Sequence, residues 1–441
     1  MSQPTGNTTE YGRLIGWDKH PGGMGEDCLV LNVWTPGVDD GRKRAVMLSI
    51  HGGGFVSGSG STPGYNGKPL AKLGDVVVVT VNHRLGALGY LHLGDLGPER
   101  FAHSGTAGML DLVAALRWVQ DNIARFGGDP ERVMVFGQSG GGAKTSTLMA
   151  MPSAQGLFHR AAVQSGSALR LTPRDRATEL ARRLLAHLGL DAGRLNELQR
   201  VPYEEILGAQ ASIAAQQPMA GFAPVVDGEA IPRHPFDPTA PEVSADVPLI
   251  IGSTLDDAAM GGGFDIDDAA ILTSLRKRYG DDAERIVGMY RRHYPEASSF
   301  LLQARMRTDR RVRRAARTQA ERKAALGKAP AYLYLWKWPS PAMGGKFGAV
   351  HGVDVGMAFN NARGAMGGDT DEARALALQF ASAWVAFAKT GDPNTAEIPE
   401  WPAYDTTTRP TMIFDSEVTL KNDPLVELRT LWDQLHGAAT T

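Results

Sequence analysis

Short runs of apolar and β-branched residues recur along the chain, separated by longer stretches in which apolar residues stand three or four positions apart. The short runs have the length and composition of β-strands. Several are apolar at every position, which is typical of strands in a parallel sheet that is covered on both faces. The predicted strands span residues 28–34, 45–50, 76–82, 133–137, 161–164, 248–252 and 331–336.

Helices are predicted between these strands. The clearest spans residues 107–126, where Ser104 or Thr106 can cap the start and Gly127 ends the pattern. Further helical patterns cover residues 177–188, 269–279, 301–325 and 373–389. This alternation predicts a single α/β domain over residues 1–441, with a doubly wound, mostly parallel central sheet flanked by helices. Residues 172–246 are the least sheet-like and are expected to form a helical cap or insert.

One serine lies in a setting that suggests chemistry. Ser139 stands in the sequence Gly-Gln-Ser-Gly-Gly of residues 137–141, directly after a predicted strand and before a run of small residues. A serine between glycines at such a turn is held in a tight bend with its hydroxyl exposed above the sheet. The alternative is a glycine-rich surface turn, but the strand and helix on either side favour a nucleophile.

A serine nucleophile also needs donors for the negative charge that develops on the substrate carbonyl. The segment His-Gly-Gly-Gly-Phe at residues 51–55 follows a predicted strand and matches a glycine-rich oxyanion loop. The N–H of Gly140, just after the serine, would be another donor. A glycine triplet alone is usually a flexible turn. The interpretation as an oxyanion loop therefore depends on its position after a strand and upstream of the serine motif.

The base and its orienting acid are less certain from spacing. In chains with this serine motif the acid and then the histidine follow the nucleophile. Among six later histidines His351 is favoured, because it lies in a glycine-flanked loop after a predicted strand. Asp256 and Asp257 follow the strand at 248–252 and are the favoured acids. Asp227 and Asp265 are further candidates for the acid.

Composition removes some classes of function. The 441 residues carry a net charge of −2, which gives no general attraction to nucleic acid or an anionic membrane. The eight arginines of residues 305–323 lack interleaved aromatic residues and are expected to form a solvated helix face. Cys28 is the only cysteine. With no apolar leader at the start, this favours a cytoplasmic location, although a leader on a longer chain would permit secretion.

Longer motifs give the chain a family resemblance. It resembles the type B carboxylesterases, the group that includes the cholinesterases, from about residue 25 to about residue 432. The motifs that carry the resemblance are Glu-Asp-Cys-Leu-Val-Leu-Asn-Val-Trp at 26–34, the loop at 51–55, Val-Asn-His-Arg-Leu-Gly at 81–86, Trp-Val-Gln-Asp-Asn-Ile-Ala-Arg-Phe-Gly-Gly-Asp-Pro at 118–130, Gln-Ser-Gly-Ser at 164–167, Pro-Val-Val-Asp-Gly at 224–228 and Thr-Gly-Asp-Pro-Asn at 390–394.

The resemblance implies an α/β-hydrolase fold and a role for each site residue. It makes Ser139 the nucleophile, His351 the general base and Asp257 the acid, at the end of the segment 252–257. The residues that it implies for the oxyanion hole are Gly53, Gly54 and Gly140. It makes Ser165 a support for the histidine and the acid. No metal and no organic cofactor are implied.

The chain departs from the family pattern at four points. Gln138 replaces a glutamate, so a neutral hydrogen-bonding pair is expected in place of a buried charge pair. Gly140 replaces alanine, which keeps the N–H but is expected to loosen the backbone. Asp257 replaces glutamate, so its loop must approach His351 more closely. Family members also carry roughly 80–100 further residues at the start, which implies a shortened chain whose exposed sheet edge favours homo-oligomers.

The expected function is therefore a serine esterase that cleaves small-molecule carboxylic esters through an acyl-enzyme. The first alternative is a carbamate or amide hydrolase of the same fold, because the same three side chains serve all of these substrates. The second alternative is a non-catalytic binding protein like the cholinesterase-like adhesion proteins. Those typically lack the serine or the histidine, and both are present here.

Overall fold

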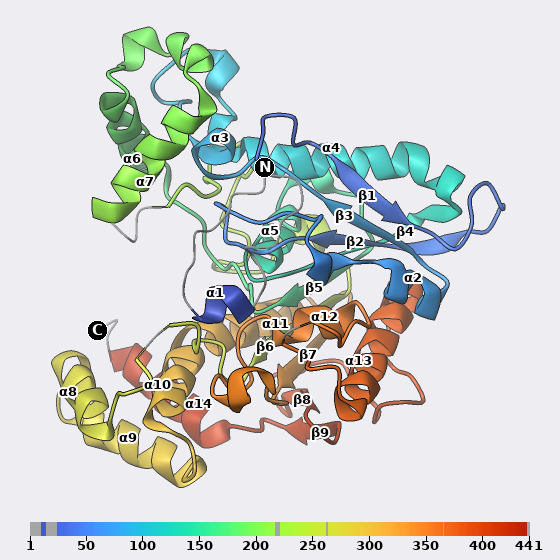
Figure 1. The fold of residues 1–441 in the computed structure, drawn as a ribbon, viewed down its shortest axis with the longest axis vertical. Coiled ribbons are helices and arrows are strands. Elements are labelled where there is room, and N and C mark those ends of the chain that lie inside the picture. Colours follow the sequence, from blue (N-terminus) through green and yellow to red (C-terminus); the bar gives the residue numbers. More distant parts are fainter. Residues whose placement is uncertain (1–9, 15–23, 217–220, 262, 365, 439–441) are drawn as a thin grey trace.

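A nine-stranded sheet runs through the molecule (Figure 1) in the order β1-β3-β2-β4-β5-β6-β7-β8-β9. The computed structural model describes residues 10–14, 24–216, 221–261, 263–364 and 366–438. The two terminal strands pair antiparallel with their neighbours, and every other pairing is parallel. The strands are β1 (Leu31–Trp34), β2 (Arg44–Ile50), β3 (Val77–Val81), β4 (Gly128–Gln138), β5 (Arg160–Gln164), β6 (Leu249–Thr254), β7 (Ala331–Trp336), β8 (Pro410–Phe414) and β9 (Thr419–Asn422).

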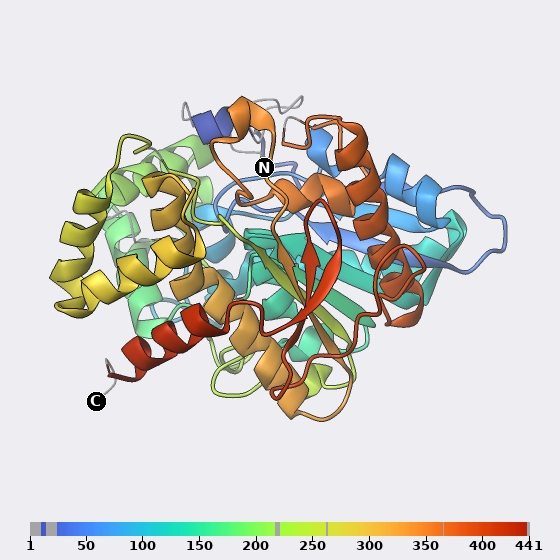
Figure 2. The ribbon, with the colours of Figure 1, turned by 90° about the horizontal axis from the view of Figure 1, so that it is seen from below.

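Alternate residues of the central strands enter two separate cores. One cluster contains Leu48, Val135, Val163 and Ile251. The other contains their chain neighbours Met47, Met134, Ala162 and Ile250. Helices α4 (Ala107–Asn122) and α11 (Arg314–Ala325) contribute to the first cluster, and α13 (Asp371–Thr390) contributes to the second. Figure 2 shows helices on both sides of the sheet. The strands are apolar throughout because both of their faces are covered.

The seven predicted strands are all present, and the predicted α/β fold is confirmed. Sequence analysis missed β8 and β9. The β8 strand begins at Pro410, a residue that usually interrupts strands, and β9 is a half-polar strand at the edge of the sheet. Four of the predicted helices correspond to α4, α6 (Arg174–His187), α8 (Asp268–Tyr279) and α13. The N-cap of α4 is Thr106, but its hydroxyl donates to the carbonyl of His103 instead of accepting from the helix.

The fifth predicted helix, at 301–325, is interrupted. It consists of α10 (Ser299–Thr308), a π-helical turn (Asp309–Arg313) and α11. The expected solvated face is wrong for four of its arginines. The ion pairs are Arg305 with Asp256 at 2.7 Å, Arg313 with Asp309, Arg317 with Asp433, and Arg322 with Asp237 at 2.9 Å. Their carboxylate partners come mostly from distant parts of the chain, which local sequence patterns do not reveal.

Further helices were not predicted. They are α1 (Glu10–Leu14), α2 (Lys68–Gly74), α3 (Gly86–Tyr90), α7 (Tyr203–Gln216), α9 (Asp282–His293), α12 (Val353–Ala358) and α14 (Val426–Ala438). Helix α5 (Gly140–Leu148) is the helix that was expected directly after the serine turn. Within the described residues, no helix combines the length and the apolar character that crossing a bilayer requires.

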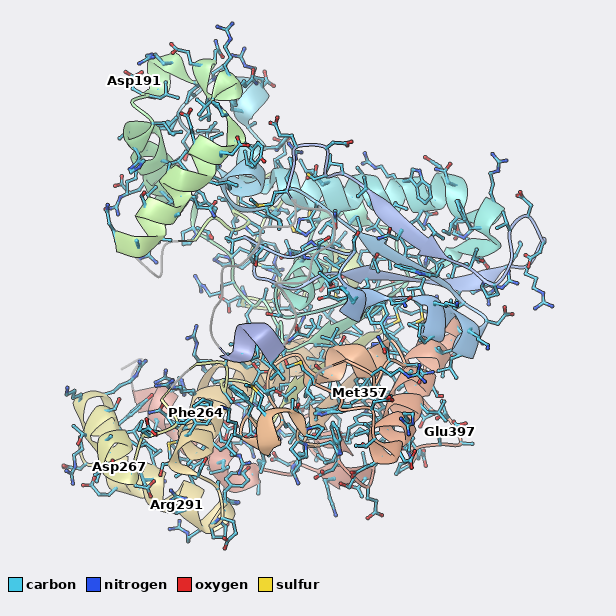
Figure 3. The ribbon with its side chains drawn as sticks, in the orientation of Figure 1. Asp191, Phe264, Asp267, Arg291, Met357 and Glu397 are labelled. Carbon is cyan, nitrogen blue, oxygen red and sulfur yellow. The ribbon has the colours of Figure 1, made fainter. Side chains whose placement is uncertain are left out.

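Two groups of helices stand apart from the sheet. Helices α6 and α7, in the segment 172–246, form the green group at the upper left of Figure 1, and Asp191 marks its outer end in Figure 3. Helices α8 and α9 form the yellow group at the lower left, where Figure 3 labels Asp267 and Arg291. Helices α8 and α9 pack with α10 and α14 around a third hydrophobic cluster, which is separate from the two clusters beside the sheet.

The contact between β2 and α5 yields a prediction about stability. A Cβ at Gly141 would lie 2.0 Å from the backbone oxygen of Ile50, so Gly141→Ala forces two backbone segments apart. We expect it to lower the free energy of unfolding by about 3 kcal/mol. Gly208 lies in the exposed middle of α7 with nothing within 4 Å of an added Cβ.

We expect the control Gly208→Ala to raise the free energy of unfolding by about 0.5–1 kcal/mol, because alanine is the better helix former. Urea unfolding of both variants measures the difference. Equal unfolding free energies for the two would contradict the close packing of α5 on β2.

Candidate active site

Ser139 occupies a strained turn between a strand and a helix. The strand β4 ends at Gln138 and α5 begins at Gly140, so the serine is the only residue between them. Its φ of 58° and ψ of −123° are unfavourable for a residue with a Cβ. The backbone compensates, because the N–H of Ser139 donates to the carbonyl of Gln164 at 2.8 Å. The strain holds a partly exposed hydroxyl at the start of α5.

The glycine after the serine permits a close backbone approach. A Cβ at Gly140 would lie 2.1 Å from the backbone oxygen of Gly54. The start of α5 therefore packs directly on the loop that follows β2. We expected a glycine at this position to loosen the backbone, but its missing Cβ here lets the two segments meet.

The loop at residues 51–55 presents free backbone donors. Its two central glycines have φ values of +88° for Gly53 and +63° for Gly54, which favour glycine. The Tyr65 hydroxyl accepts from the N–H of Gly52 at 3.1 Å, and the Ser57 hydroxyl donates to the carbonyl of Gly53 at 3.1 Å. In contrast, no described residue accepts a hydrogen bond from the N–H of Gly53, Gly54 or Gly140. Three such donors beside the serine could stabilise an oxyanion.

His351 and Asp257 form a buried hydrogen-bonded pair. The Nδ1 atom of His351 lies 2.9 Å from Oδ1 of Asp257, and Thr254 donates to Oδ2 of the same carboxylate at 3.1 Å. Burial opposes both charges, but their attraction and hydrogen bond outweigh it. The pKa of Asp257 is thus lowered, with help from the Thr254 hydroxyl, and the pKa of His351 is raised. The hydroxyl of Ser165, which was expected to support this pair, has no hydrogen-bond partner among the described residues. The carboxylate can therefore orient the imidazole and stabilise its cation.

The neighbouring residue Asp256 makes different contacts. Asp256 is buried and pairs with the Nε of Arg305 at 2.7 Å. Its other oxygen accepts from the N–H of Ala349 at 2.9 Å, and its own N–H donates to the carbonyl of Ala349. Asp256 thus holds the loop that carries His351, while Asp257 contacts the imidazole itself. Of the two favoured aspartates, Asp257 is therefore the one that is hydrogen-bonded to His351.

The other open aspartates lie elsewhere. Asp227 caps its own turn by accepting from the N–H groups of Glu229 and Ile231, and it accepts from Thr106. Asp265 is exposed. Among the described residues, neither aspartate forms a hydrogen bond or ion pair with His351.

Gln138 links the serine turn to the histidine loop. A Cβ at Gly352 would lie 3.6 Å from the Nε2 of Gln138, and a Cβ at Gly52 would lie 3.4 Å from its Oε1. The side chain of Gln138 therefore lies between the oxyanion loop and the residue after His351. The expected hydrogen-bonding pair is not found, since Nε2 has no acceptor among the described residues.

Sequence reasoning missed three residues around the histidine. The Tyr11 hydroxyl in α1 donates to the backbone oxygen of His351 at 3.1 Å. Asp354, one turn after His351, accepts from the Tyr334 hydroxyl at 2.6 Å, and burial raises the pKa of Asp354. The charge of Asp354 also contributes to the raised pKa of His351. In the sequence, the only signal for these residues is that Asp354 stands three positions after His351. No motif indicates Tyr11.

Comparisons with known proteins agree with this arrangement. A model of the Carboxylesterase family matches residues 3–429. The para-nitrobenzyl esterase of Bacillus subtilis is 38% identical over 420 residues, which cover 92% of this chain and 82% of that protein. The phenmedipham hydrolase of Pseudarthrobacter oxydans is 34% identical over 398 residues, which cover 86% of this chain and 77% of that protein.

Solved structures give the same result. A carboxylesterase from Geobacillus stearothermophilus superposes with a TM-score of 0.82 at 35% sequence identity, covering 94% of this chain and 87% of that one. A para-nitrobenzyl esterase superposes with a TM-score of 0.79 at 36% identity, covering 93% and 85%. With a nine-stranded α/β sheet and a serine turn of the expected form, this chain belongs to the carboxylesterase family and is a carboxylic ester hydrolase of the α/β-hydrolase fold.

Proposed function

We propose that the chain hydrolyses carboxylic esters through an acyl-enzyme formed on Ser139. The observation that carries the proposal is the buried hydrogen bond of 2.9 Å between His351 and Asp257, on a loop that lies beside the serine turn. A base that is oriented by a carboxylate, a partly exposed serine and a set of free N–H donors are the parts that acyl transfer requires.

The reaction follows from the roles of these groups. The imidazole of His351 takes the proton of the Ser139 hydroxyl as its oxygen attacks the ester carbonyl. The N–H groups of Gly53, Gly54 and Gly140 stabilise the oxyanion, and Asp257 stabilises the imidazolium. The imidazolium then gives its proton to the departing alcohol. Water, deprotonated by the same imidazole, attacks the acyl-enzyme and releases the carboxylic acid.

The substrate would enter a cavity of about 1080 Å³ that adjoins the oxyanion loop. Phe55, which ends that loop, forms part of its wall together with Ala168 and Leu171. Helix α6 contributes Arg176 and Leu180. We propose on this basis that the segment 172–246 acts as a cap that shapes substrate preference. Small-molecule esters fit such a space, and the reactive groups alone would also serve carbamates or amides.

The nucleophile assignment predicts the effect of one substitution. We expect Ser139→Ala to lower kcat for 4-nitrophenyl butyrate about 10⁴-fold or more and to abolish labelling by a fluorophosphonate probe, because no other group can form the acyl-enzyme. The measurement is steady-state hydrolysis together with intact-protein mass spectrometry after labelling. Ser274→Ala, at an exposed position of α8, is the control and should keep both. Undiminished labelling of the Ser139→Ala protein would refute the proposal.

The two neighbouring aspartates should respond differently. We expect Asp257→Asn to lower kcat about 10³- to 10⁴-fold, because it removes the carboxylate that orients and stabilises His351. We expect Asp256→Asn to lower kcat much less but to cost about 3 kcal/mol of unfolding free energy, because it leaves Arg305 without its charge partner. Steady-state kinetics and urea unfolding of both variants separate the two roles, and the reverse pattern would exchange the assignments.

The same pair sets the pH dependence. Hydrolysis needs neutral His351, and Asp257 raises the pKa of that imidazole, so kcat/KM should fall on the acid side from a higher pH than an unperturbed histidine would give. Asp257→Asn removes this cause, so its residual activity should fall at a lower pH. An acid limb that shifts upward in the variant would contradict the pairing.

We also propose that the chain self-associates through the β1 edge of the sheet. Leu29 and Val30, just before β1, are 57% and 49% exposed beside a strand that pairs with β3 only. We expect dimers or larger oligomers by size-exclusion chromatography with light scattering. We expect Leu29→Lys to shift the population towards monomers, because a charge at this edge opposes pairing. Wild-type protein that stays monomeric at every concentration would refute this.

A further inference from the structure

A lysine is buried directly behind the serine turn. Lys144 lies in α5, five residues after Ser139, and its exposure is 0%. Its Nζ donates to the backbone oxygen of His51 at 3.1 Å and lies 5.5 Å from the centre of the Phe55 ring. His51 and Phe55 are the first and last residues of the oxyanion loop. One side chain from the nucleophile's own helix therefore contacts both ends of that loop.

The groups around Lys144 are neutral. The rings of His51 and His83 stack with their centres 4.8 Å apart and their planes 7° from parallel. Burial, reinforced by the charge of Lys144, lowers the pKa of both histidines well below the usual range. In the described part of the chain no carboxylate forms an ion pair with Lys144. Its ammonium group thus has no compensating charge.

Stability alone gives no reason for a lysine at this position. An unpaired buried ammonium group is costly, and an apolar side chain of similar length would fill the space without that penalty. Burial lowers the pKa of Lys144 to about 7, so both its amine and its ammonium form are populated at neutral pH. Either form carries a proton that can be donated to the carbonyl of His51.

We propose that Lys144 is a positioning residue that holds the oxyanion loop in register with Ser139. By anchoring the carbonyl of His51 and the ring of Phe55, it keeps the N–H groups of Gly53 and Gly54 directed at the reacting carbonyl. The inference rests on the proposed acyl-enzyme mechanism. A displacement of about 1 Å in such a site can cost about 100-fold in rate.

The chain contains a matched control. Lys323 in α11 is also buried, with 1% exposure, and donates to the backbone oxygens of Ser244 at 2.9 Å and Ala245 at 2.6 Å. Burial lowers its pKa to about 8. Lys323 anchors a loop by the same chemistry, but that loop contributes no residue to the candidate active site. Removing each amine therefore separates a general loss of anchoring from an effect on the oxyanion loop.

The test compares Lys144→Met with Lys323→Met. We expect Lys144→Met to lower kcat for 4-nitrophenyl butyrate about 10- to 100-fold, with KM changed by less than about threefold, because the loss falls on the transition state. The inhibition constant of an alkyl trifluoromethyl ketone, which forms an oxyanion on the serine, should rise by the same factor. Lys323→Met should keep kcat and that inhibition constant while lowering the thermal midpoint. Rates are divided by the concentration of sites that react with a fluorophosphonate probe.

Three outcomes would overturn the proposal. The first is an unchanged kcat in Lys144→Met. The second is a raised KM in Lys144→Met with an unchanged inhibition constant for the ketone. The third is an equal loss of kcat in both lysine variants. If Lys144→Met does not fold, Lys144→Gln is judged by the same criteria. Failure of wild-type protein to hydrolyse the ester or react with the probe would instead refute the proposed function.

Discussion

The site depends on backbone-to-backbone contact between the loop that follows β2 and the first turn of α5. Gly140 meets Gly54, and Gly141 meets Ile50, at distances that no side chain could occupy. This contact places the free N–H groups of the two segments beside one hydroxyl. Preorganised donors of this kind stabilise developing charge without reorganising during the reaction. The loop that carries His351 also lies beside these segments, because Gln138 is close to both Gly52 and Gly352.

The consecutive residues Asp256 and Asp257 have identical side chains but different surroundings. Both are buried, but Asp256 faces the guanidinium of Arg305 and the backbone of Ala349, whereas Asp257 faces an imidazole and a hydroxyl. The first holds a loop, and the second is hydrogen-bonded to the imidazole that we propose as the base. The two functions are coupled, because the loop that Asp256 holds is the one that carries His351. Arg305 lies in α10, so this helix also contributes, through Asp256, to holding the loop that carries His351.

The sequence revealed the parts of the site that are local in the chain. The serine turn at 137–141 and the glycine loop at 51–55 each follow an apolar strand, and their patterns need only a few adjacent residues. The choice between Asp256 and Asp257 came from family resemblance, since spacing places both at the end of β6. Tyr11 could not be found, because its contact with His351 joins residues 340 positions apart. Arg305 and Arg317 were misplaced for the same reason, since their partners Asp256 and Asp433 are remote in sequence.

The elements that hold the proposed reactive groups are distinct from those that surround the proposed substrate cavity. Ser139, Asp257 and His351 follow β4, β6 and β7, whose positions are fixed by a sheet that is covered on both faces. The cavity wall comes largely from residues 168–183, which lie beyond β5 and include α6. Phe55 is the exception, because it lines the cavity and also contacts Lys144. If this cavity holds the substrate, as proposed, changes in α6 would alter which ester is accepted while the reactive groups stay in place, whereas a change at Phe55 would affect both.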